Sequence, residues 1–356
     1  MSKPGSGLRN SRQWLGRTFG SGFDELTFYA LSTWRGWQRH TYHLSNAAEM
    51  LALHELTQAE PTQLFVPPPL PDVSIQNQKM PTVLRPLARN YRYTQLAFPS
   101  AITTGNPTND MVHAHHLYRP DHKNGPTLLY LHGWHNFNAA LSLFTPLQLV
   151  APLGYNLVML ELPHHIGRTA AGTYSGELSL TANLPATLIT MQQAVSDTRA
   201  MAGWLRARGI ERLAIEGQSL GGLVAALTLT VEAAFDCAVL FVPAVEPGTS
   251  LWHSTYTRTL RRELLRQGLD ESATGALLES LRPARSRPLL EPERILVVAA
   301  TGDRVAFRPD VENFARAWGA NFAAIEWGHL SSHRLSPAFR LIRPFLGRWL
   351  GAGGIN

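Results

Sequence analysis

From about residue 91 onward, short apolar runs alternate with stretches whose apolar residues recur at helical spacing. The longest helical stretch covers residues 185–208. Strands that alternate with helices are typical of a mostly parallel sheet with helices on both faces. We therefore predict an α/β domain over residues 91–350 with an eight-stranded sheet, in which the first two strands form a hairpin. The predicted strands are Tyr93–Phe98, Val112–Tyr118, Thr127–Leu131, Leu157–Leu162, Leu213–Ile215, Ala238–Val242, Ile295–Ala299 and Phe322–Glu326.

The chain before residue 91 has a different pattern. Apolar residues at helical spacing predict helices up to about residue 60, and Pro67-Pro68-Pro69-Leu70-Pro71 predicts a stiff extended connector. Trp14, Trp34 and Trp37 lie near several arginines, a mixture that suits a membrane interface but more often packs on its own domain. We assign residues 1–90 to an N-terminal helical extension and connector, with peripheral membrane contact as the less favoured alternative.

Residues 251–290 interrupt the alternation of strands and helices. Leu260 with Leu264, and Leu277 with Leu281, predict two short helices, and Asp270 is placed to cap the second. We expect a small helical insert, or cap, over the carboxyl edge of the sheet. Its arginines are expected to form a solvated face, with an anionic group of the substrate as the less favoured partner; they are Arg258, Arg261, Arg262 and Arg266.

Composition narrows the class of protein. Of the 356 residues, 44% are hydrophobic and 16% are charged, which is ordinary for a globular chain with a large core. The net charge of +6 is not accompanied by a basic run interleaved with aromatic residues, so we expect no nucleic-acid partner. Cys237, the single cysteine, cannot form a disulfide within the chain and is expected to be a small buried apolar residue. With no secretory signal and no apolar stretch of about 20 residues, we expect a soluble, cytoplasmic protein.

The strongest candidate for chemistry is Gly217-Gln218-Ser219-Leu220-Gly221, which follows a predicted strand and leads into a predicted helix. A sharp turn between the two needs glycines on either side of the serine, because β-carbons there would collide with the strand and the helix. Leu220 begins the helix, so its backbone N–H is a free donor beside the Ser219 hydroxyl. The five-residue pattern alone also occurs by chance in turns that only let a helix pack on a sheet. Residues elsewhere in the chain are therefore needed to identify a catalytic site.

Two further polar residues follow predicted strands. Asp303 comes after Ile295–Ala299, and His329 comes after Phe322–Glu326. Open α/β sheets bind ligands at the carboxyl ends of their strands, where these residues and Ser219 would meet. Attack by a hydroxyl requires a base beside it and a group that orients the base. We therefore predict Ser219 as nucleophile, His329 as general base and Asp303 as the partner of His329.

With these motifs in place, residues 91–350 resemble the α/β-hydrolase superfamily. The resemblance rests on four segments, each after its own strand: Leu131-His132-Gly133-Trp134, Gly217-Gln218-Ser219-Leu220-Gly221-Gly222, Gly302-Asp303-Arg304-Val305 and Gly328-His329-Leu330-Ser331. It implies that the backbone N–H groups of Trp134 and Leu220 form an oxyanion hole. It also implies catalysis through an acyl-enzyme without a metal or organic cofactor. The superfamily includes amidases, thioesterases, acyltransferases and lyases, so the reaction subtype stays open.

Other residues compete for these roles. Glu246 follows the strand Ala238–Val242 and is the alternative triad acid, whereas Asp310 lies too far into the next helix. A second alternative is a metal-dependent hydrolase that uses the histidines between His113 and His122, although the polar face of an edge hairpin is the favoured interpretation; the cluster consists of His113, His115, His116, Asp121 and His122.

We predict a serine hydrolase that cleaves small-molecule carboxylic esters. The alternatives are the metal-dependent hydrolase and a non-catalytic binding protein on the same fold. Trp252, Tyr256 and the leucines of the insert favour an apolar acyl group, and the oligomeric state does not follow from the sequence. His164 and His165 follow a strand at the catalytic edge and would either contact substrate or cap backbone groups. The candidate pocket residues are His132, Gly133, His164, His165 and Trp252.

Overall fold

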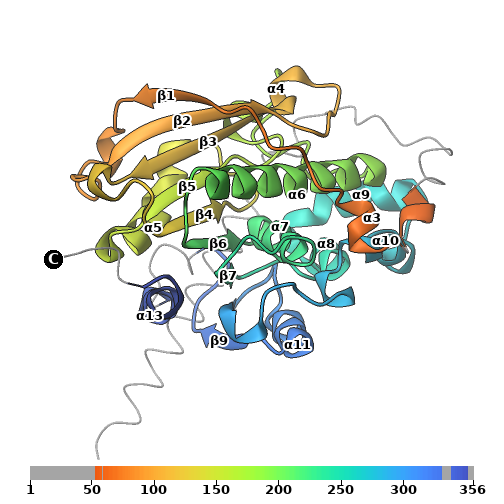
Figure 1. Ribbon diagram of the computed structural model, residues 1–356. Coiled ribbons are helices and arrows are strands. Elements are labelled where there is room, and N and C mark those ends of the chain that lie inside the picture. Colours follow the sequence, from red (N-terminus) through yellow and green to blue (C-terminus); the bar gives the residue numbers. More distant parts are fainter. Residues whose placement is uncertain (1–52, 58, 331–337, 352–356) are drawn as a thin grey trace, which may run out of the picture.

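The computed structural model describes residues 53–57, 59–330 and 338–351. A nine-stranded sheet runs through it in the order β1-β2-β3-β5-β4-β6-β7-β8-β9 (Figure 1). The helices and the membrane contact that we predict for the first 50 residues lie outside the described residues. Among the described residues, no helix combines the length and apolarity needed to cross a bilayer.

The first three strands form the antiparallel end of the sheet. β2 (Arg92–Pro99) and β3 (Met111–Tyr118) are the predicted hairpin, joined through the short helix α4 (Pro107–Asp110). β1 (Ser74–Gln78) pairs with β2 at the edge and corrects the predicted count of eight strands to nine. This strand is absent from the prediction because all five of its residues are exposed and mostly polar. The sheet therefore begins inside the segment 1–90, where the sequence pattern predicts only the extension and connector.

The other six strands are parallel to one another, and β3 joins them by antiparallel pairing with β5. Every residue of β4, β5, β7 and β8 is buried, as expected for strands that are covered on both faces. Because all six run in one direction, the loops that follow them gather at one edge of the sheet. The six strands are β4 (Thr127–Leu131), β5 (Asn156–Leu160), β6 (Leu213–Gln218), β7 (Cys237–Phe241), β8 (Ile295–Ala300) and β9 (Asn321–Ile325).

Helices cover both faces of the sheet, and neighbouring residues of each strand point into different layers. Leu129 and Leu131 of β4 belong to the core beneath α6 (Leu184–Ala207), α7 (Leu220–Leu229) and α11 (Arg308–Trp318). Leu128 and Tyr130 belong to the core beneath α5 (Ala139–Val150) and α13 (Phe339–Leu350) (Figure 1). This alternation is the two-residue period of a strand with an apolar environment on each side.

Short helical segments connect the larger elements. Besides α4, α3 (Pro61–Leu64) is a short α-helix. The 3₁₀ segments outside the insert are η1 (Thr82–Leu84), η2 (Pro120–His122), η3 (Ala151–Leu153), η4 (Ile166–Arg168) and η8 (Pro292–Arg294).

The predicted insert is helical and starts slightly earlier than expected. It contains α8 (Pro247–His253), α9 (Arg258–Arg266) and α10 (Glu271–Leu277), with the 3₁₀ turns η5 (Thr255–Thr257), η6 (Glu279–Leu281) and η7 (Pro283–Arg285). Asp270 caps α10 as predicted, with its side chain accepting a hydrogen bond from the Ala273 N–H at 2.8 Å. The buried leucines of the insert belong to the same apolar cluster as α6 and α7. The insert therefore packs continuously with the main core.

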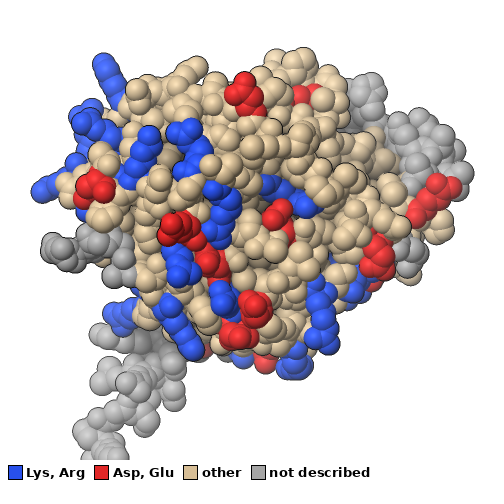
Figure 2. All heavy atoms as spheres, viewed as in Figure 1, with Lys and Arg blue, Asp and Glu red and all other residues tan. Residues whose placement is uncertain are grey.

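Charged side chains of both signs are interspersed on the face shown in Figure 2. Oppositely charged side chains also pair locally in the molecule: Asp236, for example, accepts from Arg206 at 2.9 Å and from Arg212 at 3.3 Å. Pairs of this kind offset part of the arginine charge within the described part of the chain.

Candidate active site

Ser219 lies at the turn between β6 and α7. Its backbone has a φ of 54°, which is rare for a residue with a side chain, and its N–H donates to the Phe241 carbonyl at 3.0 Å. The glycines around it are required by space. A β-carbon on Gly217 would overlap the Gly221 carbonyl, and one on Gly222 would lie 2.7 Å from the Pro243 side chain. The strained turn thus holds the serine hydroxyl at the carboxyl edge of the sheet.

The structure brings Ser219, His329 and Asp303 together in one buried chain of hydrogen bonds. Ser219 Oγ lies 2.8 Å from His329 Nε2, and His329 Nδ1 lies 2.7 Å from Asp303 Oδ2. The other carboxylate oxygen of Asp303 accepts from the N–H groups of Val305 and Ala306 at 2.8 and 2.9 Å. These two donors fix the position of the carboxylate. With Nδ1 of His329 donating to Asp303, Nε2 carries no proton and accepts from the Ser219 hydroxyl.

The competing acid lies elsewhere. The Glu246 carboxylate is held by Arg282, with its two oxygens 2.6 and 3.0 Å from the guanidinium nitrogens. This forked ion pair raises the pKa of Arg282. Asp310 lies in the first turn of α11. The carboxylate bonded to His329 is that of Asp303, in the arrangement predicted from the order of the motifs.

The loop after β4 passes directly against the serine. A β-carbon on Gly133 would lie 3.6 Å from the Ser219 β-carbon, so the next backbone amide, that of Trp134, is close to the hydroxyl. Leu220 is the first residue of α7, and its N–H has no partner within the helix. The indole of Trp134 donates to the Gly176 carbonyl at 2.7 Å and packs edge-on against Tyr256, with ring centres 5.1 Å apart. The loop after β4 and the start of α7 thus both lie beside the serine.

Two of the predicted pocket histidines instead form hydrogen bonds to backbone groups of the loop after β4. His165 donates from Nδ1 to the Pro163 carbonyl at 2.8 Å and accepts the N–H of His135 at Nε2 at 3.1 Å. His132 donates to the Gly133 carbonyl at 2.8 Å and accepts the Leu162 N–H at 3.1 Å. Burial lowers the pKa of His132 to about 4 and that of His165 well below 6.5, so both are neutral. Of the two roles left open by the sequence for His165, the geometry matches capping of backbone groups.

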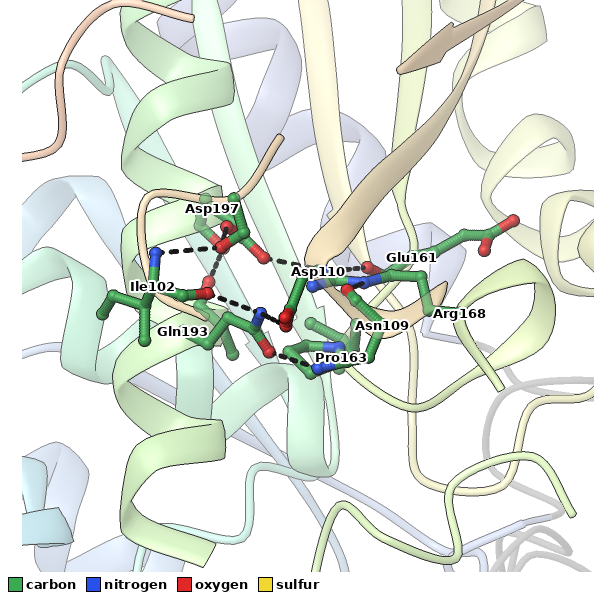
Figure 3. Close-up of polar contacts among 12 residues, drawn as sticks. Ile102, Asn109, Asp110, Glu161, Pro163, Arg168, Gln193 and Asp197 are labelled. Carbon is green, nitrogen blue, oxygen red and sulfur yellow. Dashed lines mark hydrogen bonds and ion pairs between the residues drawn. The ribbon is translucent and has the colours of Figure 1, made fainter. Parts of the chain in front are cut away.

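His164 belongs to a second buried polar cluster, part of which is shown in Figure 3. Its N–H donates to Asn109 Oδ1 at 2.8 Å, and the Asn109 amide donates to Gln193 at 2.8 Å. In the same cluster Arg168 and Asp197 form an ion pair at 2.9 Å, with side chains 0% and 1% exposed. Figure 3 shows these side chains linking α6 to the loop after β5. No sequence pattern signals this cluster, because its members come from α4, α6 and the loop after β5, which are far apart in the chain.

The histidines of the predicted metal alternative are not arranged as a ligand set. His115 lies between the Tyr93 hydroxyl and Glu161, with a 2.7 Å hydrogen bond to each. His116 is buried, which lowers its pKa to about 4, and its ring contacts Tyr118. His122 is on η2, with its side chain 43% exposed. Across residues 53–57, 59–330 and 338–351, no three His, Cys, Asp or Glu side chains are placed to hold a metal ion.

A pocket of about 720 Å³, counting its solvent-open mouth, lies beside Ser219. None of the five predicted pocket residues is among those that line it; Trp252, for example, packs against the main core, and its carbonyl accepts from Arg261. The sequence does not predict that α6 lines the pocket, because apolar residues that face a pocket cannot be told from apolar residues that face the core. The lining consists of Trp134, Leu180, Thr181, Leu184, Thr187, Met191, Ser219, Leu220, Leu223, Ala244, Pro247, Ser250, Leu251, Tyr256, Thr257, Leu260, Leu278, Leu281 and Val305.

Comparison with known sequences finds relatives without an assigned activity. No family model matches the chain. The uncharacterized protein Rv2627c of Mycobacterium tuberculosis is 30% identical over 202 residues, which span 52% of this chain and 46% of the relative. The uncharacterized protein MT2702 of a second strain matches equally well. The chain thus spans less than half the length of these relatives.

Solved structures give a likeness over most of the chain. An acetyl xylan esterase from a Paenibacillus species is 14% identical with a TM-score of 0.59, and the match covers 87% of this chain and 97% of that one. Acetyl xylan esterase 1 from Thermoanaerobacterium is 13% identical with a TM-score of 0.58, over 86% and 95% of the two chains. The Pyrococcus furiosus esterase Pf2001 is 16% identical with a TM-score of 0.52, over 80% and 100%. At these identities the likeness establishes a shared fold.

Proposed function

We propose that this chain, which has the α/β-hydrolase fold, is a serine hydrolase that cleaves carboxylic esters through an acyl-enzyme. The observation that carries the proposal is the hydrogen-bonded series Ser219–His329–Asp303, with distances of 2.8 and 2.7 Å. These are the distances expected between a nucleophile, its general base and the group that orients the base. The esterases that share the fold support the same reaction class.

The reaction follows from the positions of these groups. Ser219 Oγ attacks the ester carbonyl while His329 Nε2 takes the hydroxyl proton, and the carbonyl oxygen becomes an oxyanion. The N–H groups of Trp134 and Leu220 stabilise this charge. Collapse of the tetrahedral intermediate expels the alcohol, whose oxygen receives the proton from His329. Water then attacks the acyl-enzyme by the same route, with His329 first taking a proton from water and then returning it to Ser219.

Asp303 supports His329, the proposed general base. Its charge stabilises the imidazolium that forms at His329 during each attack, and its hydrogen bond keeps Nε2 directed at the serine. The Val305 and Ala306 amides hold the carboxylate in place beside the imidazole. In this mechanism every acid, base and electrostatic role is filled by the chain itself, without a metal or organic cofactor.

A fluorophosphonate probe tests the proposal. We expect the full-length protein to be labelled and to hydrolyse p-nitrophenyl acetate, and the Ser219→Ala variant to lose both properties. Ser272→Ala is the matched control, because Ser272 is exposed on α10 and its loss should change neither. A wild-type protein that is neither labelled nor active would favour a non-catalytic binding protein on this fold. Equal labelling of wild type and Ser219→Ala would refute the role of Ser219.

A further inference from the structure

We infer that the pocket beside Ser219 holds the acyl part of the substrate and that this acyl group is an uncharged, apolar chain longer than acetyl. The inference rests on the proposed function and adds the substrate class to it. It is carried by the chemistry of the pocket wall and by the position of the pocket relative to the serine and the histidine.

The wall of the pocket is built by three parts of the chain. Helix α6 contributes Leu184 and Met191, α7 contributes Leu223, and the insert contributes Leu260 and Leu281, among others. All five are buried in the main apolar core of the molecule. An acyl chain in this pocket would exchange water for aliphatic surface over its length, and each buried methylene would add to binding.

The described wall of the pocket carries no charged side chain. Among the described residues that line it, none is Asp, Glu, Lys, Arg or His. Arg282 of the insert is engaged by Glu246 at 2.6 Å and by Glu279 at 2.9 Å. The hydroxyls in the wall are also partly used: Thr257 Oγ1 donates to the Leu251 carbonyl at 2.6 Å. A carboxylate at the end of an acyl chain would lose much of its hydration and gain no oppositely charged partner from the described wall.

The position of the pocket assigns it to the acyl group rather than to the alcohol. Ser219 lines the pocket together with Trp134 and Leu220, whose amides receive the oxyanion in the proposed mechanism. His329, which must protonate the departing alcohol, is not among the lining residues. The leaving oxygen must approach His329 Nε2, so the alcohol lies on the histidine side of the carbonyl carbon. The substituent that remains on that carbon then points into the pocket.

A series of p-nitrophenyl esters measures this preference. For acyl chains from acetate to hexanoate, we expect kcat/KM to rise about fourfold for each methylene, which corresponds to ~0.8 kcal/mol per methylene. The whole rise over four methylenes is then roughly 200-fold. The mono-p-nitrophenyl ester of glutaric acid has the length of the valerate ester but ends in a carboxylate, and we expect it to react at least about 100-fold more slowly. Acetate esters of longer alcohols should show a much shallower dependence on chain length.

Two substitutions on one helix provide the matched comparison. Ser250 of α8 lines the pocket, and its neighbour Thr249 does not. Ser250→Leu adds side-chain volume inside the pocket, so we expect the hexanoate-to-acetate ratio of kcat/KM to fall at least about tenfold. Thr249→Leu should leave this ratio within about twofold of the wild type. If Ser250→Leu does not fold, Met191→Ala removes chain contacts from the α6 wall and should also lower the ratio.

The outcomes separate this inference from the proposed function. Fluorophosphonate labelling and acetate hydrolysis that depend on Ser219 support the hydrolase. If these hold but acetate or the glutarate ester is the best substrate, the inference is overturned and the hydrolase stands. A steeper dependence on the alcohol than on the acyl chain would also overturn it. If neither labelling nor hydrolysis occurs, the proposed function fails, and the inference fails with it.

Discussion

Glu216 is a buried carboxyl on the strand that leads to the proposed nucleophile. The residue is 2% exposed, and its Oε2 has no hydrogen-bond partner among the described residues. Burial raises the pKa of Glu216 from 4.5 to about 8. The folded protein therefore carries Glu216 in its protonated form at neutral pH, whereas the unfolded chain ionises it above pH 4.5.

This difference predicts how stability changes with pH. Because the unfolded chain releases the proton first, the free energy of unfolding falls as pH rises from about 4.5 to about 8. At ~1.36 kcal/mol per pKa unit, the shift corresponds to a loss on the order of 5 kcal/mol over that range. A loss of this size is a large part of the stability of an ordinary domain, on the order of 5–15 kcal/mol. Glu216→Gln keeps the shape of the side chain and removes the ionisation.

Urea unfolding of wild type and Glu216→Gln between pH 5 and 8.5 measures the effect. The buried neutral histidines have folded pKa values below 6.5, so they raise stability as pH rises to about 6.5 and oppose Glu216 there. The difference between the two proteins cancels this term. We expect near equality at pH 5 and an advantage of at least about 2 kcal/mol for the variant at pH 8. Glu312→Gln, on the exposed face of α11, is the control and should shift stability by less than ~0.5 kcal/mol at every pH. A difference between wild type and Glu216→Gln that does not change with pH would refute the reasoning.

Three other substitutions test the site and its supports. Asp303→Asn should lower kcat for ester hydrolysis by roughly 10³–10⁴-fold, because the amide favours the wrong tautomer of His329, while the circular dichroism spectrum stays unchanged. Glu246→Gln should leave kcat within a few-fold of the wild type. The reverse result would make Glu246 the acid of the triad. His165→Phe removes the nitrogen that accepts the His135 N–H and so loosens the loop beside the serine. We expect kcat to fall more than tenfold at a nearly constant KM. A change confined to KM would count against this role of His165. Arg168→Met should lower the free energy of unfolding, measured in urea, by about 3–5 kcal/mol, because it leaves Asp197 as an unpaired buried charge. Adding Asp197→Leu should restore most of that stability. If the double variant is no more stable than Arg168→Met, the ion pair is not the cause.

The triad geometry could be predicted from the sequence because each motif follows its own parallel strand. Ser219, Asp303 and His329 are far apart in the chain, but strands of one direction deliver their following loops to one edge. β1 could not be predicted in the same way. An exposed edge strand of polar residues needs only one partner for its backbone and no buried face, so it leaves no apolar period in the sequence.

The pocket and the bracing histidines depend on contacts that local patterns do not contain. Along α6, Met191 faces the pocket and Val195 the core, and both are apolar positions of one helical stripe. His132 and His165 follow strands at the catalytic edge, which makes them candidates for substrate contact in the sequence alone. Their ring nitrogens instead bind backbone groups of neighbouring loops, which only the folded arrangement brings within reach.

The leucines of the insert share one continuous buried cluster with α6 and α7. A variant that lacks residues 251–290 would therefore lose part of the cover over the central helices, and we expect it to aggregate rather than to yield a more open enzyme. For the same reason, transplanting this segment from a relative should succeed only when the facing side of α6 is exchanged with it. Among relatives, a wider or narrower pocket beside Ser219 would then require simultaneous changes on α6 and on the insert.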